Sequence, residues 1–444
     1  MNALLRWYLR PALVVRILGC FVAGSLIGGA LWYVSQAAGS DVARRLMPYV
    51  SPFGTVFVHM LKMIVVPVIF FSLVVGAASL PIQRFGRVGV KTLGWYLATS
   101  ALAAGLGVCL ALAVNPGAGS DLSRWQDLAR LMGDPGSEFS GKATAGGVLA
   151  QLLLTLFRNP FEALAEGNFL PIIVFSILFG LAIRVCAEAG GDERRAARLE
   201  QLAGLLGACQ DAVFRMVGWI LEYSPIGVLA LTVMNFGLNG PKIVGPYVSV
   251  TLGVVLGVLV MVFAVYPALL WAATRRNPFP VLRRTQEAML MAFITRSSAA
   301  TLPVTLKVAE EELKVRNELA SFSLPLGATI NMDGVCVHLP MFAVLAANLF
   351  GIPLTLGSLV LLVLTTVLSS IGAGGVPGGS LMLLYVILQT MGLSGEQVAV
   401  VVALALGINP ILDMFETMNN VTGDLVCTYA VAHREGLIHA SPPP

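Results

Sequence analysis

The residues best suited to do chemistry in this chain form one polar stripe near its carboxyl end. Asp413, Asn420 and Asp424 stand at positions i, i+7 and i+11, so a helix would place the other two within about 20° of Asp413. Glu416 and Thr417 stand beside them. A charge at the centre of a bilayer costs roughly 2.5 to 3.5 kcal/mol on insertion scales, so such residues persist mainly where they bind something. The stripe is therefore the first candidate binding site.

The stripe has an alternative explanation that the sequence can weigh. The membrane span could end near Leu412, and an amphipathic helix with solvated acidic groups could follow on the surface. Helices at a membrane interface are usually rich in Lys and Arg, whereas residues 413–431 contain neither. We therefore expect the stripe to face inward.

A second polar cluster interrupts an otherwise apolar helix predicted over 318–349. It reads Asn331-Met332-Asp333-Gly334, and Gly334 would loosen the backbone and free carbonyl groups to act as ligands. Ligands that are all oxygen suit a hard cation such as Na⁺. The cluster predicts a cation site.

The composition places these clusters in an integral membrane protein. Of 444 residues, 57% are hydrophobic and 12% are charged, and the mean hydropathy is +0.83. Soluble domains carry about a quarter charged residues. Several apolar runs are long enough to cross roughly 30 Å of hydrocarbon as helices. They lie near residues 12–37, 50–82, 87–114, 146–187, 205–238 and 246–273.

The distribution of charge predicts the orientation in the membrane. Basic residues cluster near 6–16, 84–91, 194–198 and 275–284, which places these segments in the cytoplasm, and the acidic 115–145 loop outside. The first apolar run is too long for a cleavable signal. We expect a multi-pass protein of the plasma (inner) membrane with cytoplasmic termini. The net charge of +4 reflects this topology, so no nucleic-acid partner is expected.

Two stretches cannot be straight spans. Residues 279–312 are broken by Thr295-Arg296-Ser297-Ser298 and Pro303, and residues 353–391 contain a Gly-rich run over 369–380. Irregular backbone at membrane depth needs cover from protein or a water-lined cavity, and two such stretches point to a transporter's binding site. The alternative is that each is a loop outside the membrane. Against this, the Gly-rich run carries no charge, and solvated loops normally do.

At this point the chain resembles the glutamate transporter homologues, or dicarboxylate/amino acid:cation symporters. The resemblance covers nearly the whole chain. It is carried by LKMIVVPVIFFSLVVGAASL (61–80), NPFEALAEGNFLPIIVFSILFGLAI (159–183), YSPIGVLAL (223–231), TRSSAATLP (295–303), GATINMDG (327–334), GAGGVPGG (372–379) and ILDMFETMNNVTGD (411–424).

The resemblance implies an all-α integral membrane fold. Eight transmembrane helices plus two re-entrant hairpins, related by inverted repeats, would assemble as a homotrimer in the lipid bilayer. Residues 1–85 and 116–240 would form a static scaffold domain. Residues 86–115 and 241–434 would form a transport domain that moves as an elevator, and 435–444 a cytoplasmic tail.

The resemblance also implies three Na⁺ sites. The first matches Gly327, Asn331, Asn420 and Asp424. The second matches Tyr96, Thr99, Ser100, Asn331 and Asp333. The third would use backbone near Thr329, Met332, Ser370 and Ile371, although Ala373 stands where the family usually has Thr.

For the substrate, Asp413 matches the carboxylate that takes the α-amino group. The other positions that match the family's substrate site are Arg296, Ser297, Ser298, Val335, Val376, Gly379, Glu416, Thr417 and Asn420, of which Ser298, Val376, Gly379 and Asn420 match contacts to the α-carboxylate. Arg296 would orient Asp413 or Glu416; alternatively it is an interfacial Arg that snorkels to the headgroups.

One departure from the family decides the substrate class. Members that carry acidic substrates have Arg where this chain has Glu416, and Thr where it has Val335. A substrate carboxylate a few ångströms from Glu416 would cost on the order of 4 kcal/mol at an effective dielectric near 20. Either Glu416 binds a cationic or amide side chain, or it pairs with Arg296 and leaves a neutral pocket. An acidic substrate would require a protonated Glu416.

The sequence therefore predicts a secondary active Na⁺-coupled symporter for a neutral polar or basic amino acid, with an acidic amino acid/dicarboxylate symporter or a proton-coupled variant as the alternative. No enzyme is expected, because the YD and GxGD motifs of intramembrane aspartyl proteases are missing. No organic cofactor is implied. A channel would need a ring of residues from symmetric subunits, whereas these polar groups belong to one chain.

Overall fold

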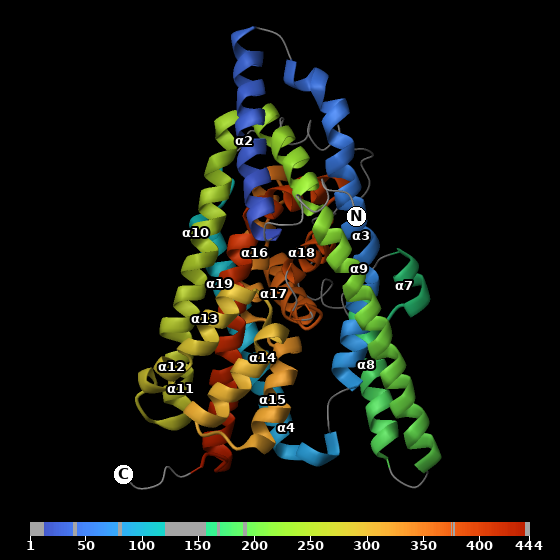
Figure 1. The fold of residues 1–444 in the computed structure, drawn as a ribbon, viewed down its shortest axis with the longest axis vertical. Coiled ribbons are helices and arrows are strands. Elements are labelled where there is room, and N and C mark those ends of the chain that lie inside the picture. Colours follow the sequence, from blue (N-terminus) through green and yellow to red (C-terminus); the bar gives the residue numbers. More distant parts are fainter. Residues whose placement is uncertain are drawn as a thin grey trace, which may run out of the picture.

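The computed structural model describes residues 13–38, 42–78, 82–119, 157–166, 169–189, 193–373, 375 and 378–439. These residues are almost entirely helical (Figure 1). Within them, the one strand-like pairing is an isolated bridge between Val315 and Ile438. The expected all-helical class is thus confirmed.

The first half of the chain forms long apolar helices. Among the described residues of the whole chain, seven helical segments are long and apolar enough to cross a membrane. The expected eight spans and the re-entrant placement of the hairpins remain predictions. The helices of this half are α2 (Leu13–Ala37), α3 (Val42–Ala78), α4 (Ile82–Val114), α7 (Pro160–Glu166), α8 (Phe169–Glu188), α9 (Glu193–Asn239), α10 (Val244–Val260) and α11 (Tyr266–Thr274), with the last two joined through a π-helical turn over Met261–Val265.

The first interrupted stretch is a helical hairpin, which confirms that it is not a straight span. It begins with α12 (Phe279–Arg284) and α13 (Gln286–Thr295), turns at Arg296 and returns as α14 (Ser298–Lys307). Arg296 has a φ of 55°, in the left-handed region that L-residues enter at a cost. Ser297 caps α14 by accepting a hydrogen bond from the Ala300 amide at 3.1 Å.

The second interrupted stretch is also a hairpin, and its tip meets the first. It consists of α17 (Leu356–Ser370), a turn, and α18 (Gly379–Thr390). Ser297 Oγ donates to the Gly375 carbonyl at 2.8 Å, and the Ala299 amide approaches the same oxygen at 3.3 Å. The two tips are therefore joined at the Gly375 carbonyl, by one side-chain hydroxyl and one backbone amide of the first hairpin.

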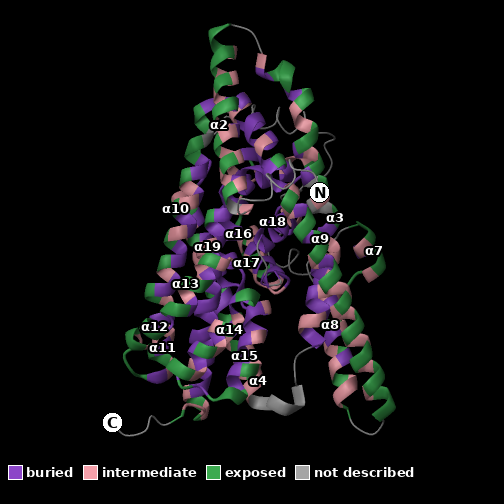
Figure 2. Ribbon diagram, in the orientation of Figure 1, coloured by how far each residue is buried: buried purple, intermediate pink, exposed green. Residues whose placement is uncertain are grey.

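Two further elements complete the interior. The predicted helix over 318–349 is split at Asn331 and Met332 into α15 (Asn317–Ile330) and α16 (Asp333–Phe350), as the polar cluster indicated. The final helix, α19 (Gly395–Glu435), runs for 41 residues through Pro410. Figure 2 shows that the most buried residues lie in the α16 to α19 region, while α2 and the far ends of α8 and α9 are largely exposed.

The helices pack in two groups. Helices α2, α3, α8 and α9 pack chiefly against one another, whereas α4 packs on α16, and α13 and α15 pack on α19. In Figure 1, α3, α8 and α9 form one flank and α10 to α13 the other, with α16 to α19 between them.

The residues after α19 form a C-terminal clamp, made of 437–439 paired with 314–316. The Arg316 amide donates to the Leu437 carbonyl at 2.9 Å, and the His439 amide donates to the Lys314 carbonyl at 2.8 Å. An ion pair between Lys91 and Glu435 links α4 to the end of α19 close by. The end of α19 is thus attached to the segment that joins the first hairpin to α15.

Candidate functional site

The polar stripe of α19 faces the protein interior. Asp413 is 5% exposed, Glu416 1%, Asn420 3% and Asp424 1%. A surface helix with solvated acidic groups is therefore excluded. The buried carboxylates meet the helix break in α15–α16 and the tips of both hairpins.

Asp424 lies beside the break between α15 and α16. The Asn331 amide donates to Asp424 Oδ1 at 3.0 Å, and Thr99 Oγ1 donates to Asn331 Oδ1 at 3.1 Å. A Cβ added at Gly327 would collide with the Asp424 carboxylate and would lie 2.8 Å from the Tyr96 hydroxyl oxygen. The glycine thus leaves room next to a carboxylate, an amide and a phenol, which are oxygen donors suited to a hard cation.

Asp333 is the second carboxylate at the break. Ser100 Oγ donates to Asp333 Oδ1 and the Tyr266 hydroxyl donates to Oδ2, both at 2.8 Å. A Cβ at Gly423 would lie 2.6 Å from the Tyr266 oxygen and 2.9 Å from Asp333 Oδ2. Tyr266 and Gly423 are site residues that the sequence did not reveal, although a tyrosine in an apolar run next to Pro267 is a signal.

The structure brings the first two predicted ion-binding sets together around Asn331. Tyr96 donates to the Ser323 carbonyl at 2.8 Å and reaches the Gly327 and Asp424 side of the cluster. Asn420 meets the same helix break, where its Oδ1 accepts the Gly334 amide at 2.7 Å, and it also lines the pocket described below.

The third predicted set is less closely joined. Thr329 and Ser370 each donate to a carbonyl of their own helix, at 2.8 Å, and no hydrogen bond among the described residues connects the two. Ile371 packs near Ile330, and Met332 lines the pocket described next.

A pocket of about 270 Å³ opens between the hairpin tips, the helix break and α19. Of the predicted substrate residues, Ser297 holds the two tips together, and Val376 lies outside the described residues. All the other predicted substrate residues line the pocket: Arg296, Ser298, Val335, Gly379, Asp413, Glu416, Thr417 and Asn420. Four residues that were not predicted for the substrate complete the lining, namely Met332, Ala373, Gly375 and Ser380.

Asp413 links α19 to both hairpins. Its Oδ2 accepts the Gly378 amide at 3.2 Å and lies 3.8 Å from Arg296 Nη1. The Arg296 side chain is 14% exposed and points to Asp413, which favours its expected role of orienting that carboxylate over the snorkelling alternative.

Glu416 has a partner that the sequence did not reveal. Its Oε1 pairs with Nδ1 of His338 on α16, and both side chains are almost completely buried. The expected alternative pairing with Arg296 is replaced by this one. The signal was a single histidine in the apolar run 335–347, one helical turn after Gly334.

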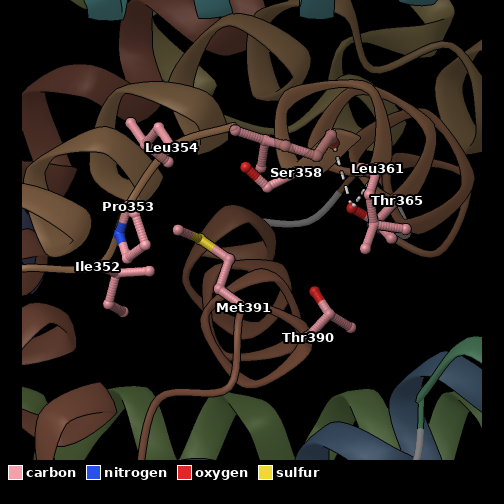
Figure 3. Close-up of a pocket in the computed structure, with 9 residues that line it drawn as sticks. Ile352, Pro353, Leu354, Ser358, Leu361, Thr365, Thr390 and Met391 are labelled. Atoms are coloured by element: carbon pink, nitrogen blue, oxygen red, sulfur yellow. Dashed lines mark hydrogen bonds between the residues drawn. The ribbon is translucent and has the colours of Figure 1, made fainter. Parts of the chain in front are cut away.

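A second pocket, of about 400 Å³, lies between the start of α17 and the end of α18. No charged side chain lines it, and Figure 3 shows Met391 extending toward Ile352 and Pro353 across it. Its polar groups are neutral hydroxyls only, with no charge to pair with a zwitterion, so the carboxylate-lined pocket is the candidate site.

Known proteins match this chain over almost its full length. The chain is 30% identical over 430 residues to the proton/glutamate-aspartate symporter of Escherichia coli (strain K12), covering 96% of this chain and 93% of the relative. It is 30% identical over 427 residues to the serine/threonine transporter SstT of Bifidobacterium adolescentis, covering 94% and 89%. It is also 30% identical over 458 residues to neutral amino acid transporter A of Bos taurus, covering 94% and 81%.

The names of these relatives give different substrates, and one name gives the proton as coupling ion. The model of the sodium:dicarboxylate symporter family matches residues 13–434, which include every element of the site described above. The resemblance drawn from the sequence motifs is thereby confirmed. A multi-pass membrane chain with two helical hairpins around a buried carboxylate pocket, matched by that model from its first described helix to its last, belongs to the sodium:dicarboxylate symporter family.

Proposed function

We propose that this chain is a secondary active symporter that couples Na⁺ to the uptake of a neutral polar or basic amino acid. The observation that carries the proposal is the pair of buried carboxylates, Asp413 and Glu416, which line one pocket with Arg296. Asp413 has Arg296 as its counter-ion, while Glu416 faces the pocket as a further acceptor. A substrate side chain that is itself a carboxylate would add an anion to an already acidic site.

The main-chain groups of an amino acid have complementary partners here. Asp413 suits the α-ammonium group, since a buried carboxylate forms strong charge-assisted hydrogen bonds. Ser298, Gly379 and Asn420 line the same pocket and offer donors to the α-carboxylate. Val376 would contribute a further contact to the α-carboxylate. Arg296, Ser297, Val335 and Thr417 would shape the rest.

Na⁺ is the co-transported substrate in this proposal. The space beside Gly327 would receive one ion among Asn331, Asn420 and Asp424, and the Asp333 side would receive another with Tyr96, Thr99 and Ser100. Two carboxylates would offset the charge of the ions. A third ion would use carbonyls near Thr329, Met332, Ser370 and Ile371.

The two packing groups support an elevator mechanism. The helices within 1–85 and 116–240 would stay fixed as scaffold, and those within 86–115 and 241–434 would carry the pocket across the bilayer. A homotrimer in the plasma membrane with cytoplasmic termini remains part of the proposal.

Uptake into proteoliposomes tests the function. We expect an inward Na⁺ gradient to drive accumulation of serine, threonine, glutamine or lysine, and replacement of Na⁺ by choline to abolish it. Strong aspartate uptake without competition from these amino acids would overturn the substrate class. The proton-coupled variant has one relative in its favour, the proton/glutamate-aspartate symporter. Uptake driven by a pH gradient without Na⁺ would show that the coupling ion is the proton and not Na⁺.

A further inference from the structure

Glu416 and His338 form a buried pair that has only one of its members in the pocket. Glu416 lines the pocket, whereas His338 does not and lies behind it on α16. His338 is fully buried, and its ring packs against Phe342 with 4.8 Å between the ring centroids. Any influence of His338 on a bound molecule must therefore act through Glu416.

The close packing of α16 against α19 sets the positions of Glu416 and His338. A Cβ at Gly334 would lie 2.5 Å from Glu416 Cα, so the two backbones touch where Gly334 lacks a side chain. On one side of that contact the Gly334 amide donates to Asn420 Oδ1, and one turn further along α16 His338 meets Glu416. Residues four apart share a helix face, so both contacts follow from one antiparallel crossing.

The pair leaves two buried atoms without a hydrogen-bond partner among the described residues, Glu416 Oε2 and His338 Nε2. Among the described residues, Glu416 Oε2 forms no hydrogen bond although it is buried, while Oε1 is held by His338 Nδ1. With Glu416 as the acceptor in that contact, the proton belongs to Nδ1. A buried acceptor without a donor is unfavourable, and a donor supplied by a bound molecule would relieve that cost.

We infer that Glu416 Oε2 accepts a hydrogen bond from an N–H or O–H group on the substrate side chain, and that His338 is the positioning residue that holds this carboxylate for it. The inference rests on the proposed function and narrows it. The substrate class becomes amino acids whose side chains donate, namely hydroxyl, amide or ammonium side chains. Apolar side chains of the same shape and acidic side chains are rejected.

Isosteric substrates test the acceptor without any mutation. Threonine and valine differ by one hydroxyl in place of a methyl, and glutamine and methionine have similar lengths. We expect threonine and glutamine to be preferred roughly tenfold or more over valine and methionine, as KM ratios in Na⁺-driven uptake. Equal KM values within both pairs would overturn the inference.

Variants of His338 test the positioning role. His338→Phe keeps a ring against Phe342 and removes the Nδ1 donor, so the threonine-to-valine preference should fall roughly tenfold, toward equality. His338→Asn keeps an N–H donor and should regain part of the preference. His59→Leu, on the exposed face of α3, is the matched control and should leave the preference unchanged.

An unaltered preference in His338→Phe would overturn the positioning role. If that variant is not recovered as folded protein, the His338→Asn variant decides, because loss of the preference despite a retained donor would also contradict it. Failure of the proposed function looks different. In that case no amino acid accumulates on a Na⁺ gradient. If only this inference fails, uptake continues, but threonine and glutamine are not preferred over valine and methionine.

Discussion

A substitution of Asp424 tests the proposed Na⁺ site without changing the pocket proposed for the substrate. It accepts from Asn331 and does not line the substrate pocket. Asp424→Asn removes the charge with little change in shape. Because hydrogen bonds to charged groups contribute about 1.5 to 3 kcal/mol, we expect the Na⁺ concentration for half-maximal uptake to rise about tenfold or more.

The measurement is a Na⁺ titration of uptake at saturating substrate. Glu396→Gln is a matched control, since Glu396 is a carboxylate in the first turn of the same helix, remote in sequence from the stripe. An unchanged titration in the Asp424 variant would remove this carboxylate from the ion site.

A substitution of Gly327 tests the same proposed Na⁺ site by filling its space, without changing any charge. The methyl group of Gly327→Ala would enter the space between Asp424 and Tyr96. We expect the half-saturating Na⁺ concentration to rise severalfold although all charges remain. Gly105→Ala in α4 adds a methyl where no atom lies within 4 Å of it, so its Na⁺ titration should match the wild type. Identical titrations in both variants would contradict an ion beside Gly327.

At the level of single residues, the sequence predicted the groups that carry charge and several of their partners, such as Arg296 beside Asp413, but it missed two others. Asp413, Asp424 and Asp333 were predicted because a carboxylate in an apolar segment is conspicuous. His338 and Tyr266 lie 78 and 67 residues from the carboxylates that they contact. Such pairs depend on how two helices cross, which no local pattern encodes.

The crossing of α16 and α19 is the element on which the site depends. Gly334→Ala places a methyl against the Glu416 backbone, and overpacking of this kind typically costs about 1 to 3 kcal/mol. We expect a lower thermal midpoint in detergent together with loss of uptake. Gly105→Ala should be at least as stable as the wild type, because Ala favours a helix interior by roughly 1 kcal/mol. If the thermal midpoint of Gly334→Ala equals that of Gly105→Ala, the close backbone contact between α16 and α19 does not contribute to stability.

Element boundaries were predictable where the chain carries strong local signals. The turns at Arg296 and in the Gly-rich run, and the break at Asn331, follow from residues that disfavour a helix. The inward orientation of α19 followed from the missing Lys and Arg. The meeting of the two hairpin tips was not predictable, because it joins the Ser297 hydroxyl to a backbone carbonyl, that of Gly375, 78 residues away.

For the whole molecule, the elevator proposal makes a prediction about motion between the two packing groups. A Cβ at Gly372 would lie 3.7 Å from Leu73 Cγ, so the second hairpin touches α3 there. In a background without native cysteines, oxidation of the Leu73→Cys/Gly372→Cys double variant should arrest uptake. Reduction should restore it, because a disulfide tolerates little change in Cβ separation.

The control is a cross-link inside one group. A Cβ at Gly24 of α2 would lie 2.9 Å from Thr232 Cβ of α9, so an oxidised Gly24→Cys/Thr232→Cys double variant should still transport. Full uptake by a Leu73/Gly372 cross-linked protein, with cross-linking verified by mass, would argue against relative movement of the two groups.

The C-terminal clamp has a practical consequence for anyone who handles this protein. Because 437–439 pair with 314–316, a truncation at the end of α19 would remove the backbone hydrogen bonds that hold the last helix to the base of the first hairpin. Purification tags and fluorescent reporters should therefore be appended beyond His439. A fusion placed earlier in the chain would remove this attachment of the last helix.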